Sequence, residues 1–485
     1  MPPKQTKAAA PRKAGEDTKE DPLQAVVLLD SFEDTFRPFT TSRPRCLLPI
    51  CNTPLIEYTL DYLASCGAQD VYLYANNQIE QVESYINASR WVTSSSPFRK
   101  CTLLRCIATG VGDLMRDLDS QQIMQGDFLC VSGDIVSDFP IQKALRAHKA
   151  RRAKDKNAIM TMILRDRSGS EIRHQDQSVS TFVIDPTKDR CLQYEELSAT
   201  DSFGSHLDPE MLRYPELDIR QDLVDCRIDI CTPDVLSLWS DNFDNQRPRK
   251  DFLFGVLKDY ELNGKTIHTY IVDDYYANRV SDLSAYIVIS RDLQSGSAGS
   301  LMLSSNSSGS RLAQLRNNVL KGEDVILQRP VRLESNSLIG SATSVGAHST
   351  ISNSHIGQRC QIGKNTTLKS AYLWDDVTVG SNVTIDTVII GSEAFIGDNS
   401  TIGEGCLLDF SSRIPANTHV PAGSIVTKST TFADGVKDKK TDNYFDNATD
   451  DDTAEATGVW ARSIYAKPEF NDSISSLASD ESEIS

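Results

Sequence analysis

Aliphatic residues recur every six positions across the last third of the chain, and this repeat limits the possible folds severely. Ile339, Ile356, Leu373 and Ile390 lie 17 residues apart, which corresponds to three six-residue steps with one step shortened. This period is typical of a β-helix, in which three short strands form one triangular coil and each strand points an aliphatic side chain at the axis. The sequence therefore predicts a left-handed parallel β-helix over residues 331–430.

Glycine follows many of these aliphatic residues, as at Gly340, Gly357 and Gly391. Because glycine adopts backbone torsions that other residues avoid, we expect these glycines to provide the torsions at the coil corners. We expect the coil histidines His348 and His355 to occupy surface corners. A β-helix acyltransferase would need a histidine that faces a groove, so this third class of function is disfavoured.

Strand-like and helix-like segments alternate between Gln24 and Leu293. Residues 25–29 are a continuous aliphatic run, as in a strand buried on both faces of a parallel sheet. Residues 53–65 carry apolar side chains at helical spacing and are followed by Gly67, a stop signal. The alternation predicts an α/β domain over residues 23–295, with a doubly wound, mostly parallel sheet.

The segments outside these two domains have biased compositions. Residues 1–22 lack the apolar centre of a signal peptide and predict a disordered leader. The Ser/Gly-rich residues 296–330 predict a linker followed by a helix, and the acidic residues 431–485 predict a disordered tail.

The net charge of −17 excludes some classes of partner and favours others. Binding to nucleic-acid phosphates needs clustered cations, so we expect no direct nucleic-acid contact, whereas a basic protein partner fits the charge. No stretch approaches the roughly 20 apolar residues of a membrane span, so we expect no membrane contact. The eleven cysteines lack metal-ligand spacing and predict reduced thiols in a cytosolic protein, with Cys226 and Cys231 on opposite faces of one strand.

Two segments resemble the nucleotidyltransferases that make sugar nucleotides. Residues 47–58 (LLPICNTPLIEY) look like that family's substrate-loop segment, and residues 131–134 (VSGD) look like the strand end that carries its metal-binding aspartate. The resemblance spans residues 24–428. Catalysis in that family needs a glycine-rich loop around the triphosphate, a basic residue and two carboxylates that hold Mg²⁺.

The segments that would supply this chemistry are altered in the chain. Residues 30–36 (DSFEDTF) follow the first strand and contain no glycine, but carboxylates and bulky rings. Residues 276–282 (YANRVSD) have no glycine after the acid that would be the second metal ligand, so we expect Asp134 to cap or hydrogen-bond the following loop instead. We therefore predict no catalytic residue, no metal and no cofactor, and a degenerate nucleotide site formed by Asp30, Phe32, Glu33, Arg45 and Asp134.

Three segments together resemble the epsilon subunits of eukaryotic translation initiation factor 2B, namely residues 28–32 (LLDSF), 43–49 (RPRCLLP) and 131–137 (VSGDIVS). The resemblance implies a subunit of the factor that exchanges GDP for GTP on initiation factor 2. Its implied partners are that GTPase, its gamma subunit especially, and the alpha, beta, gamma and delta subunits of factor 2B. The family ends in an all-helical exchange domain, and nothing after Lys428 is amphipathic over helical length, so we expect a truncated form.

Asn242 and Phe243 resemble the Asn-Phe motif of that family, which implies contact with the GTPase. An amide beside an apolar anchor also suits a partner groove on physical grounds. The structural alternative is that Phe243 packs back on Trp239 and Leu236 at the end of a short helix. A cationic run follows the motif and could add partner contacts or form a solvated face: Arg247, Arg249 and Lys250.

An active sugar-nucleotide pyrophosphorylase of the GDP-mannose type is the alternative function. It predicts Mg²⁺-dependent release of pyrophosphate from a nucleoside triphosphate and a sugar phosphate. The acidic, glycine-free loop of residues 30–36 disfavours this function, because it would repel and exclude the triphosphate.

Overall fold

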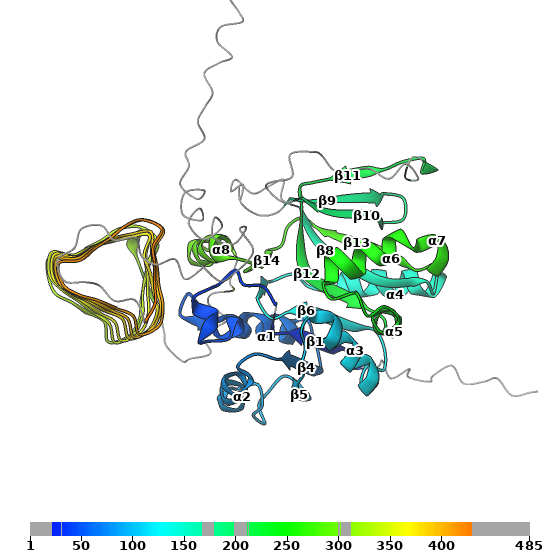
Figure 1. The fold of residues 1–485 in the computed structure, drawn as a ribbon, viewed down its shortest axis with the longest axis horizontal. Coiled ribbons are helices and arrows are strands. Elements are labelled where there is room, and N and C mark those ends of the chain that lie inside the picture. Colours follow the sequence, from blue (N-terminus) through cyan, green and yellow to red (C-terminus); the bar gives the residue numbers. More distant parts are fainter. Residues whose placement is uncertain are drawn as a thin grey trace, which may run out of the picture.

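The computed structural model describes residues 22–30, 32–166, 179–197, 211, 213–298, 301 and 312–428. Figure 1 shows an α/β domain beside a triangular β-helix. The predicted fold class is thereby confirmed, while the expectations for the leader and the acidic tail lie outside the described residues. In the part of the chain that is described, no helix combines the length and the apolar character needed to cross a bilayer.

A ten-stranded sheet forms the centre of the α/β domain, in the order β11-β9-β10-β13-β8-β12-β6-β1-β4-β5. The strands are β1 (Gln24–Leu28), β4 (Asp70–Ala75), β5 (Lys100–Arg105), β6 (Phe128–Ser132), β8 (Ala158–Asp166), β9 (Val179–Asp185), β10 (Arg190–Leu197), β11 (Asp218–Arg220), β12 (Leu223–Cys231) and β13 (Thr266–Val272). Two short pairs accompany the sheet: β2 (Pro49–Ile50) with β3 (Thr53–Pro54), and β7 (Ile135–Ser137) with β14 (Ala277–Arg279).

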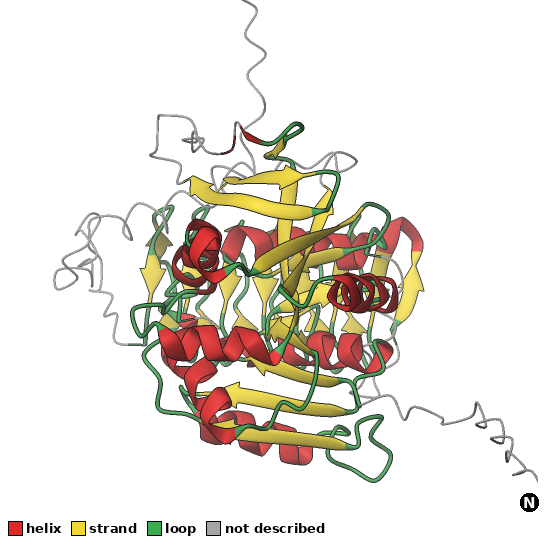
Figure 2. Cartoon of the chain, turned by 90° about the vertical axis from the view of Figure 1, so that its right-hand side faces the viewer, coloured by secondary structure: helices red, strands yellow, loops and turns green. Residues whose placement is uncertain are grey.

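Helices cover both faces of this sheet (Figure 2). The helical elements of the α/β domain are η1 (Phe39–Thr41), η2 (Arg45–Leu47), α1 (Leu55–Ser65), α2 (Ile79–Ala88), α3 (Val111–Gln121), α4 (Gln142–Lys154), α5 (Pro233–Asp241), η4 (Pro248–Leu253), α6 (Phe254–Lys258), α7 (Tyr260–Asn263) and α8 (Leu283–Ser295). One core lies between the sheet and α1, α2 and α4, and a second lies between the sheet and α3, α5 and α6.

The sheet is mixed. Strands β5, β4, β1 and β6 are parallel, and so is the pair β8 and β13, but β12 is antiparallel to both of its neighbours. Strands β10, β9 and β11 also pair antiparallel at one edge, so the sheet is less parallel than expected. Cys226 and Cys231 lie on this inserted strand, and their side chains belong to the two different cores. The prediction that these two thiols point to opposite faces is therefore confirmed.

Three parallel sheets make up the β-helix. The first contains β16 (Val319–Lys321), β19 (Ser337–Ile339), β22 (His355–Ile356), β25 (Tyr372–Leu373), β28 (Ile389–Ile390), β31 (Leu407–Leu408) and β34 (Ile425–Val426), with β15 (Ala313–Leu315) antiparallel at its edge. The second contains β17 (Ile326–Leu327), β20 (Ser344–Val345), β23 (Gln361–Ile362), β26 (Thr378–Val379), β29 (Phe395–Ile396) and β32 (Arg413–Ile414). The third contains β18 (Arg332–Leu333), β21 (Thr350–Ser352), β24 (Thr367–Lys369), β27 (Thr384–Asp386), β30 (Thr401–Ile402) and β33 (His419–Val420).

The parallel coils begin at Val319, before the boundary expected at residue 331. Between Leu312 and Pro330, where the sequence suggested a linker and a helix, the structure has strands and the short 3-10 turn η5 (Arg316–Asn318). The repeat is harder to recognise there, because Lys321 pairs with Ile339 and stands where the later coils have an aliphatic residue on the axis.

The glycines that directly follow the axial aliphatic residues do not supply the unusual torsions, so that expectation is wrong. The positive φ angles occur two residues later, as at Asn365 (53°) and Asn382 (58°). Asparagine tolerates this conformation, and the Nδ2 of Asn365 donates to the Oδ1 of Asn382 at 3.1 Å, in a ladder that continues along the coils. The glycines are needed for a different reason: a Cβ at Gly340 would lie 2.4 Å from the carbonyl oxygen of Gly357 in the next coil.

The two domains are joined by an apolar and aromatic interface. Helix α8 packs against the first sheet of the β-helix, where the Nε1 of Trp374 donates to the Tyr286 hydroxyl at 3.0 Å. The ring of Phe39 lies 4.7 Å from the ring of Trp374. The segment that resembles the substrate loop also reaches this interface, since the Nδ2 of Asn52 donates to the carbonyl of Ile356 at 3.1 Å.

His355 lies within this interface, so its expected position at a surface corner is wrong. Its side chain is 5% exposed, with the Nε2 atom 2.5 Å from the Oε1 of Gln294 and the Nδ1 atom 3.7 Å from the Sγ of Cys51. The prediction for His348 is confirmed, because that residue is exposed. A further coil histidine, His419, was overlooked and is also exposed.

We expect His355 to make the protein less stable in mild acid. Burial and the charge of Arg291 lower the pKa of His355 from 6.5 to about 3. Because the unfolded state then binds the proton more readily, the free energy of unfolding is greatest above pH 6.5 and falls as the pH drops below that value. Between pH 7 and pH 5 the loss from this residue is about 2 kcal/mol.

Urea unfolding of the wild type and of His355→Gln at pH 7 and pH 5 measures this loss. Glutamine does not titrate, so the variant should lose about 2 kcal/mol less than the wild type between the two pH values. An identical pH dependence in both proteins would contradict the prediction.

Candidate functional site

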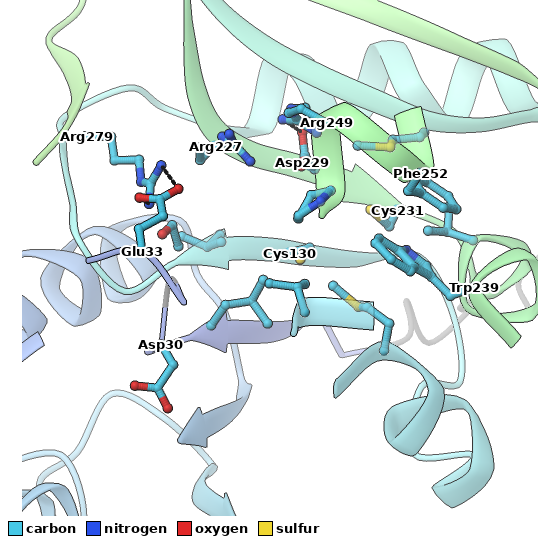
Figure 3. Close-up of a pocket in the computed structure, with 18 residues that line it drawn as sticks. Asp30, Glu33, Cys130, Arg227, Asp229, Cys231, Trp239, Arg249, Phe252 and Arg279 are labelled. Carbon is cyan, nitrogen blue, oxygen red and sulfur yellow. Dashed lines mark hydrogen bonds and ion pairs between the residues drawn. The ribbon is translucent and has the colours of Figure 1, made fainter. Parts of the chain in front are cut away.

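The candidate site lies where β1 and β6 end, at the carboxyl edge of the parallel strands, which is the usual place for ligand sites in such sheets (Figure 3). The loop after β1 provides Glu33, and the turn after β6 provides Asp134. Arg279 comes from β14, and Arg45 from η2. Residues from four separate segments therefore meet at one edge of the sheet.

These four side chains form a compact ionic cluster of two carboxylates and two guanidinium groups. The Nη2 of Arg45 lies 2.7 Å from the Oδ2 of Asp134, and the Nε of Arg279 lies 3.1 Å from its Oδ1. The Oε2 of Glu33 lies 3.0 Å from the Nη2 of Arg279 and 3.3 Å from the Nη1 of Arg45. Each carboxylate is thus paired with both cations.

Asp134 does not cap the following loop, so that expectation is wrong. Its side chain accepts a hydrogen bond from Ser132 at 2.6 Å and is otherwise held by the two arginines. Burial raises the pKa of Asp134, but the charges of Arg279 and Arg45 outweigh burial and hold that pKa below its ordinary value. The carboxylate stays ionised, with its charge neutralised by protein cations.

Two of the residues predicted for the degenerate site lie apart from the cluster. The carboxylate of Asp30 is directed away from Glu33 and Arg279 (Figure 3) and accepts hydrogen bonds from the backbone N–H groups of Asn76 and Asn77. Phe32 has a positive φ of 54° and packs, half-buried, on the core between the sheet and α3. Both residues shape the loop after β1 and neither joins the ionic cluster.

Asp282 has a structural role at the start of α8. Its Oδ1 accepts a hydrogen bond from the backbone N–H of Ala285 at 2.7 Å, so it is the N-cap of that helix. By the resemblance to nucleotidyltransferases, residues 276–282 would hold the second metal-binding acid. They instead provide Arg279, which forms an ion pair with Asp134. A cation therefore occupies the position beside the first carboxylate.

A second ionic cluster, missed at the sequence level, lies deeper in the same region. Arg249 is 2% exposed and contacts the Oδ2 of Asp225 at 2.6 Å and the Oδ1 of Asp229 at 2.8 Å. Burial raises the pKa of Asp225, but the charges of Arg249 and Arg227 outweigh it and hold that pKa below its ordinary value. The expectation that Arg249 forms part of a solvated or partner-binding run is wrong. Charged residues on a buried strand must be paired. The charged residues within the apolar strand β12 could therefore have predicted a buried ionic cluster.

A cavity of about 70 Å³ lies between the two ionic clusters. Its lining combines charged groups such as Glu33 and Arg227 with apolar side chains such as Trp239, as Figure 3 shows. Sites for small organic ligands typically have volumes of roughly 300–1,000 Å³. The cavity is therefore much smaller than a nucleotide site.

The Asn-Phe motif lies outside this cavity, in the loop after α5. The Oδ1 of Asn242 accepts a hydrogen bond from the backbone N–H of Asp244 at 3.1 Å. The side chain of Phe243 is 73% exposed, whereas Trp239 is buried and stacks on Phe252 at 4.5 Å. The alternative in which Phe243 packs back on Trp239 is therefore wrong.

The other two members of the cationic run are exposed. Arg247 is 66% exposed and pairs with Asp251 at 2.8 Å, which lies on the following helical turn. Lys250 is 51% exposed and lies 3.7 Å from Glu196. Both side chains already have acidic neighbours in this structure.

Comparisons with known proteins agree with both domains. A family described as nucleotidyl transferase matches residues 33–190, and one described as the EIF2B subunit epsilon LbH domain matches residues 316–420. A mannose-1-phosphate guanyltransferase of Hypocrea jecorina is 23% identical over 136 residues, which is 26% of this chain and 35% of that protein.

Two relatives are more similar and cover more of the chain. Translation initiation factor eIF2B subunit epsilon of Schizosaccharomyces pombe is 42% identical over 325 residues, or 67% of this chain and 48% of that protein. The subunit of the same name from Dictyostelium discoideum is 39% identical over 277 residues, or 56% of this chain and 38% of that protein. The chain thus spans about half the length, or less, of these curated relatives. On these matches and the fold, the chain belongs to the family of epsilon subunits of translation initiation factor 2B.

Proposed function

We propose that this chain acts in a guanine-nucleotide exchange factor for initiation factor 2, in which its α/β domain binds the GTPase through Asn242 and Phe243. The observation that carries the proposal is the exposure of Phe243, whose side chain is 73% accessible beside the amide of Asn242. A large aromatic group on a surface loop is a common anchor in protein interfaces. Burial of its ring by a partner would remove apolar area from water, which is favourable.

The proposal includes the loss of nucleotidyltransferase activity. Magnesium binding at Asp134 would have to displace Arg45 and Arg279, which already neutralise that carboxylate. A triphosphate would have to enter a cavity of about 70 Å³ and compete with Glu33 for Arg45 and Arg279. The residues therefore do not fit a metal-nucleotide complex, and the α/β domain serves as a binding scaffold in the cytosol.

We further propose that the β-helix helps to assemble the complex with the alpha, beta, gamma and delta subunits of factor 2B. Two large apolar side chains on its second sheet support this role: Ile326 is 63% exposed and Phe395 is 45% exposed. Partner subunits that cover such side chains would gain apolar burial.

Calorimetric titration of purified initiation factor 2 into the chain tests the GTPase contact. Replacing both Asn242 and Phe243 with alanine should weaken binding by about 30-fold or more, as expected for loss of a central aromatic anchor. Phe254→Ala is a matched control, because Phe254 is 50% exposed on α6 and lies outside the motif. Equal affinity of the double variant and the wild type would refute the proposed contact.

The alternative function is tested by pyrophosphate release. The chain incubated with Mg²⁺, GTP and mannose 1-phosphate should release no pyrophosphate above the blank, because both ionic clusters occupy the reaction site with protein groups. Magnesium-dependent release that is lost in Asp134→Asn would establish the sugar-nucleotide enzyme instead.

A further inference from the structure

The loop that carries Phe243 rests on helix α3, and one side chain makes most of this contact. The Nη1 of Arg116 donates to the carbonyl oxygens of Trp239 at 3.3 Å, Asn242 at 3.4 Å and Asn245 at 3.3 Å. Trp239 lies in the last turn of α5, where carbonyl groups have no partner within the helix. The Nη1 of Arg116 therefore serves as hydrogen-bond donor for a carbonyl at the end of α5 and for carbonyls before and after Phe243.

The guanidinium group of Arg116 also lies beneath the exposed ring. Its Cζ atom is 5.3 Å from the centroid of Phe243, within the range of a cation–π contact. The side chain of Arg116 is only 12% exposed, and its Nη2 is fixed by the Oδ1 of Asp113 at 2.7 Å. Asp113 in turn accepts hydrogen bonds from the backbone and hydroxyl of Thr109. The cation is thus immobilised before any partner arrives.

The start of α3 is shaped to let the loop approach this closely. A Cβ at Gly112 would lie 2.0 Å from the carbonyl oxygen of Asn245, so only glycine fits there. The backbone N–H of Gly112 donates to the carbonyl of Gln246 at 3.1 Å, and the Nε2 of Gln246 donates to the carbonyl of Phe243 at 3.4 Å. The loop is therefore bound to α3 at Asn242, Asn245 and Gln246, and an internal hydrogen bond closes it.

We infer that Arg116 is a positioning residue of the GTPase-binding surface, which holds residues 242–246 and the ring of Phe243 in the conformation that the partner recognises. The inference rests on the proposed function, because it assigns to Phe243 the contact with the GTPase. A loop that is ordered before binding loses less conformational entropy on association, and this raises affinity without any direct contact from Arg116.

A double-mutant cycle on the full chain tests the inference, with affinity for initiation factor 2 as the readout. Arg116→Ala should weaken binding about tenfold, since several hydrogen bonds from a charged donor are lost. In the Phe243→Ala background the same change should weaken binding by less than about twofold, because the ring that Arg116 positions is then absent. Arg220→Ala is the matched control, since Arg220 at the end of β11 is a half-buried arginine that pairs with Asp166 and Asp222.

Each outcome separates the inference from the proposed function. If Phe243→Ala weakens binding and Arg116→Ala does not, the positioning role is refuted while the proposed contact stands. If the two losses are fully additive, Arg116 acts independently of the ring and the inference also fails. If Phe243→Ala binds like the wild type, the proposed contact fails and the inference fails with it.

Arg116→Lys provides the test if the alanine variant does not fold. Lysine keeps the positive charge but lacks the planar group that reaches three carbonyls and Asp113 together. We expect about threefold to tenfold weaker binding and faster hydrogen exchange of the amides of residues 242–246. Wild-type affinity in this variant would overturn the inference.

Discussion

Arg249→Met should lower the free energy of unfolding by about 3–5 kcal/mol, because it removes the buried cation that two buried carboxylates share. The carboxylates are those of Asp225 and Asp229, which contact Arg249 at 2.6 and 2.8 Å. Methionine fills much of the same volume, so the loss reports charge rather than a cavity. Chemical denaturation at pH 7 measures the effect.

The pH dependence of this loss distinguishes charge from packing. Without Arg249, burial raises the pKa of the two carboxyl groups, and a raised pKa in the folded state makes the variant less stable as the pH rises. The difference from the wild type should therefore shrink between pH 7 and pH 5. Arg247→Met is the matched control: Arg247 is 66% exposed and paired with Asp251, so we expect a loss below about 1 kcal/mol. Equal losses for the two arginines would contradict the assignment.

Gly363→Ala should destabilise the β-helix by about 3 kcal/mol or more, because the added methyl group would enter the backbone of the next coil. A Cβ at Gly363 would lie 2.4 Å from both the carbonyl carbon and the carbonyl oxygen of Gly380. Neither atom belongs to a flexible side chain, so two coils would have to separate and weaken their ladder of hydrogen bonds. Thermal unfolding followed by circular dichroism measures the loss.

Asn382→Gly is the control for this glycine argument. Asn382 has a φ of 58°, which glycine adopts without strain, and only exposed side-chain hydrogen bonds to Asn365 and Asn399 are lost. We expect a change within about 1 kcal/mol. If Gly363→Ala were as mild as this control, the coils would be less closely stacked than the structure indicates.

The sequence predicted the coils well because the determining interactions are local and periodic. Residues such as Ile339 and Ile356 are fully buried on the axis, as their period requires. The period does not say which corner residue adopts a positive φ, so glycine was given the role that residues such as Asn365 have. A glycine such as Gly363 is required because the backbone of Gly380, 17 residues later, lies against it in the next coil. The sequence period alone does not reveal this contact.

The α/β site was harder to predict because its contacts are distant in sequence. Arg279 reaches Asp134 across 145 residues, and no local pattern records that pairing. The absence of glycine after β1 did point correctly to an unusual loop, but Asp30 turned out to bind backbone amides beyond β4. By contrast, Asp282 immediately before α8 carries an ordinary N-cap signal that could have been used.

The interface between the domains has a consequence for insertions and deletions in the β-helix. Phe39 contacts both Trp374 and Phe410, which lie on different coils. Each coil advances the stack by about 4.8 Å, the spacing of paired strands. Loss of one complete coil between these two rings would keep the remaining coils stacked. It would, however, move Phe410 by one strand spacing relative to Phe39 and so disturb their contact. The contacts of Phe39 thus fix the number of coils between Trp374 and Phe410. A coil added or lost after Phe410 would leave both ring contacts in place.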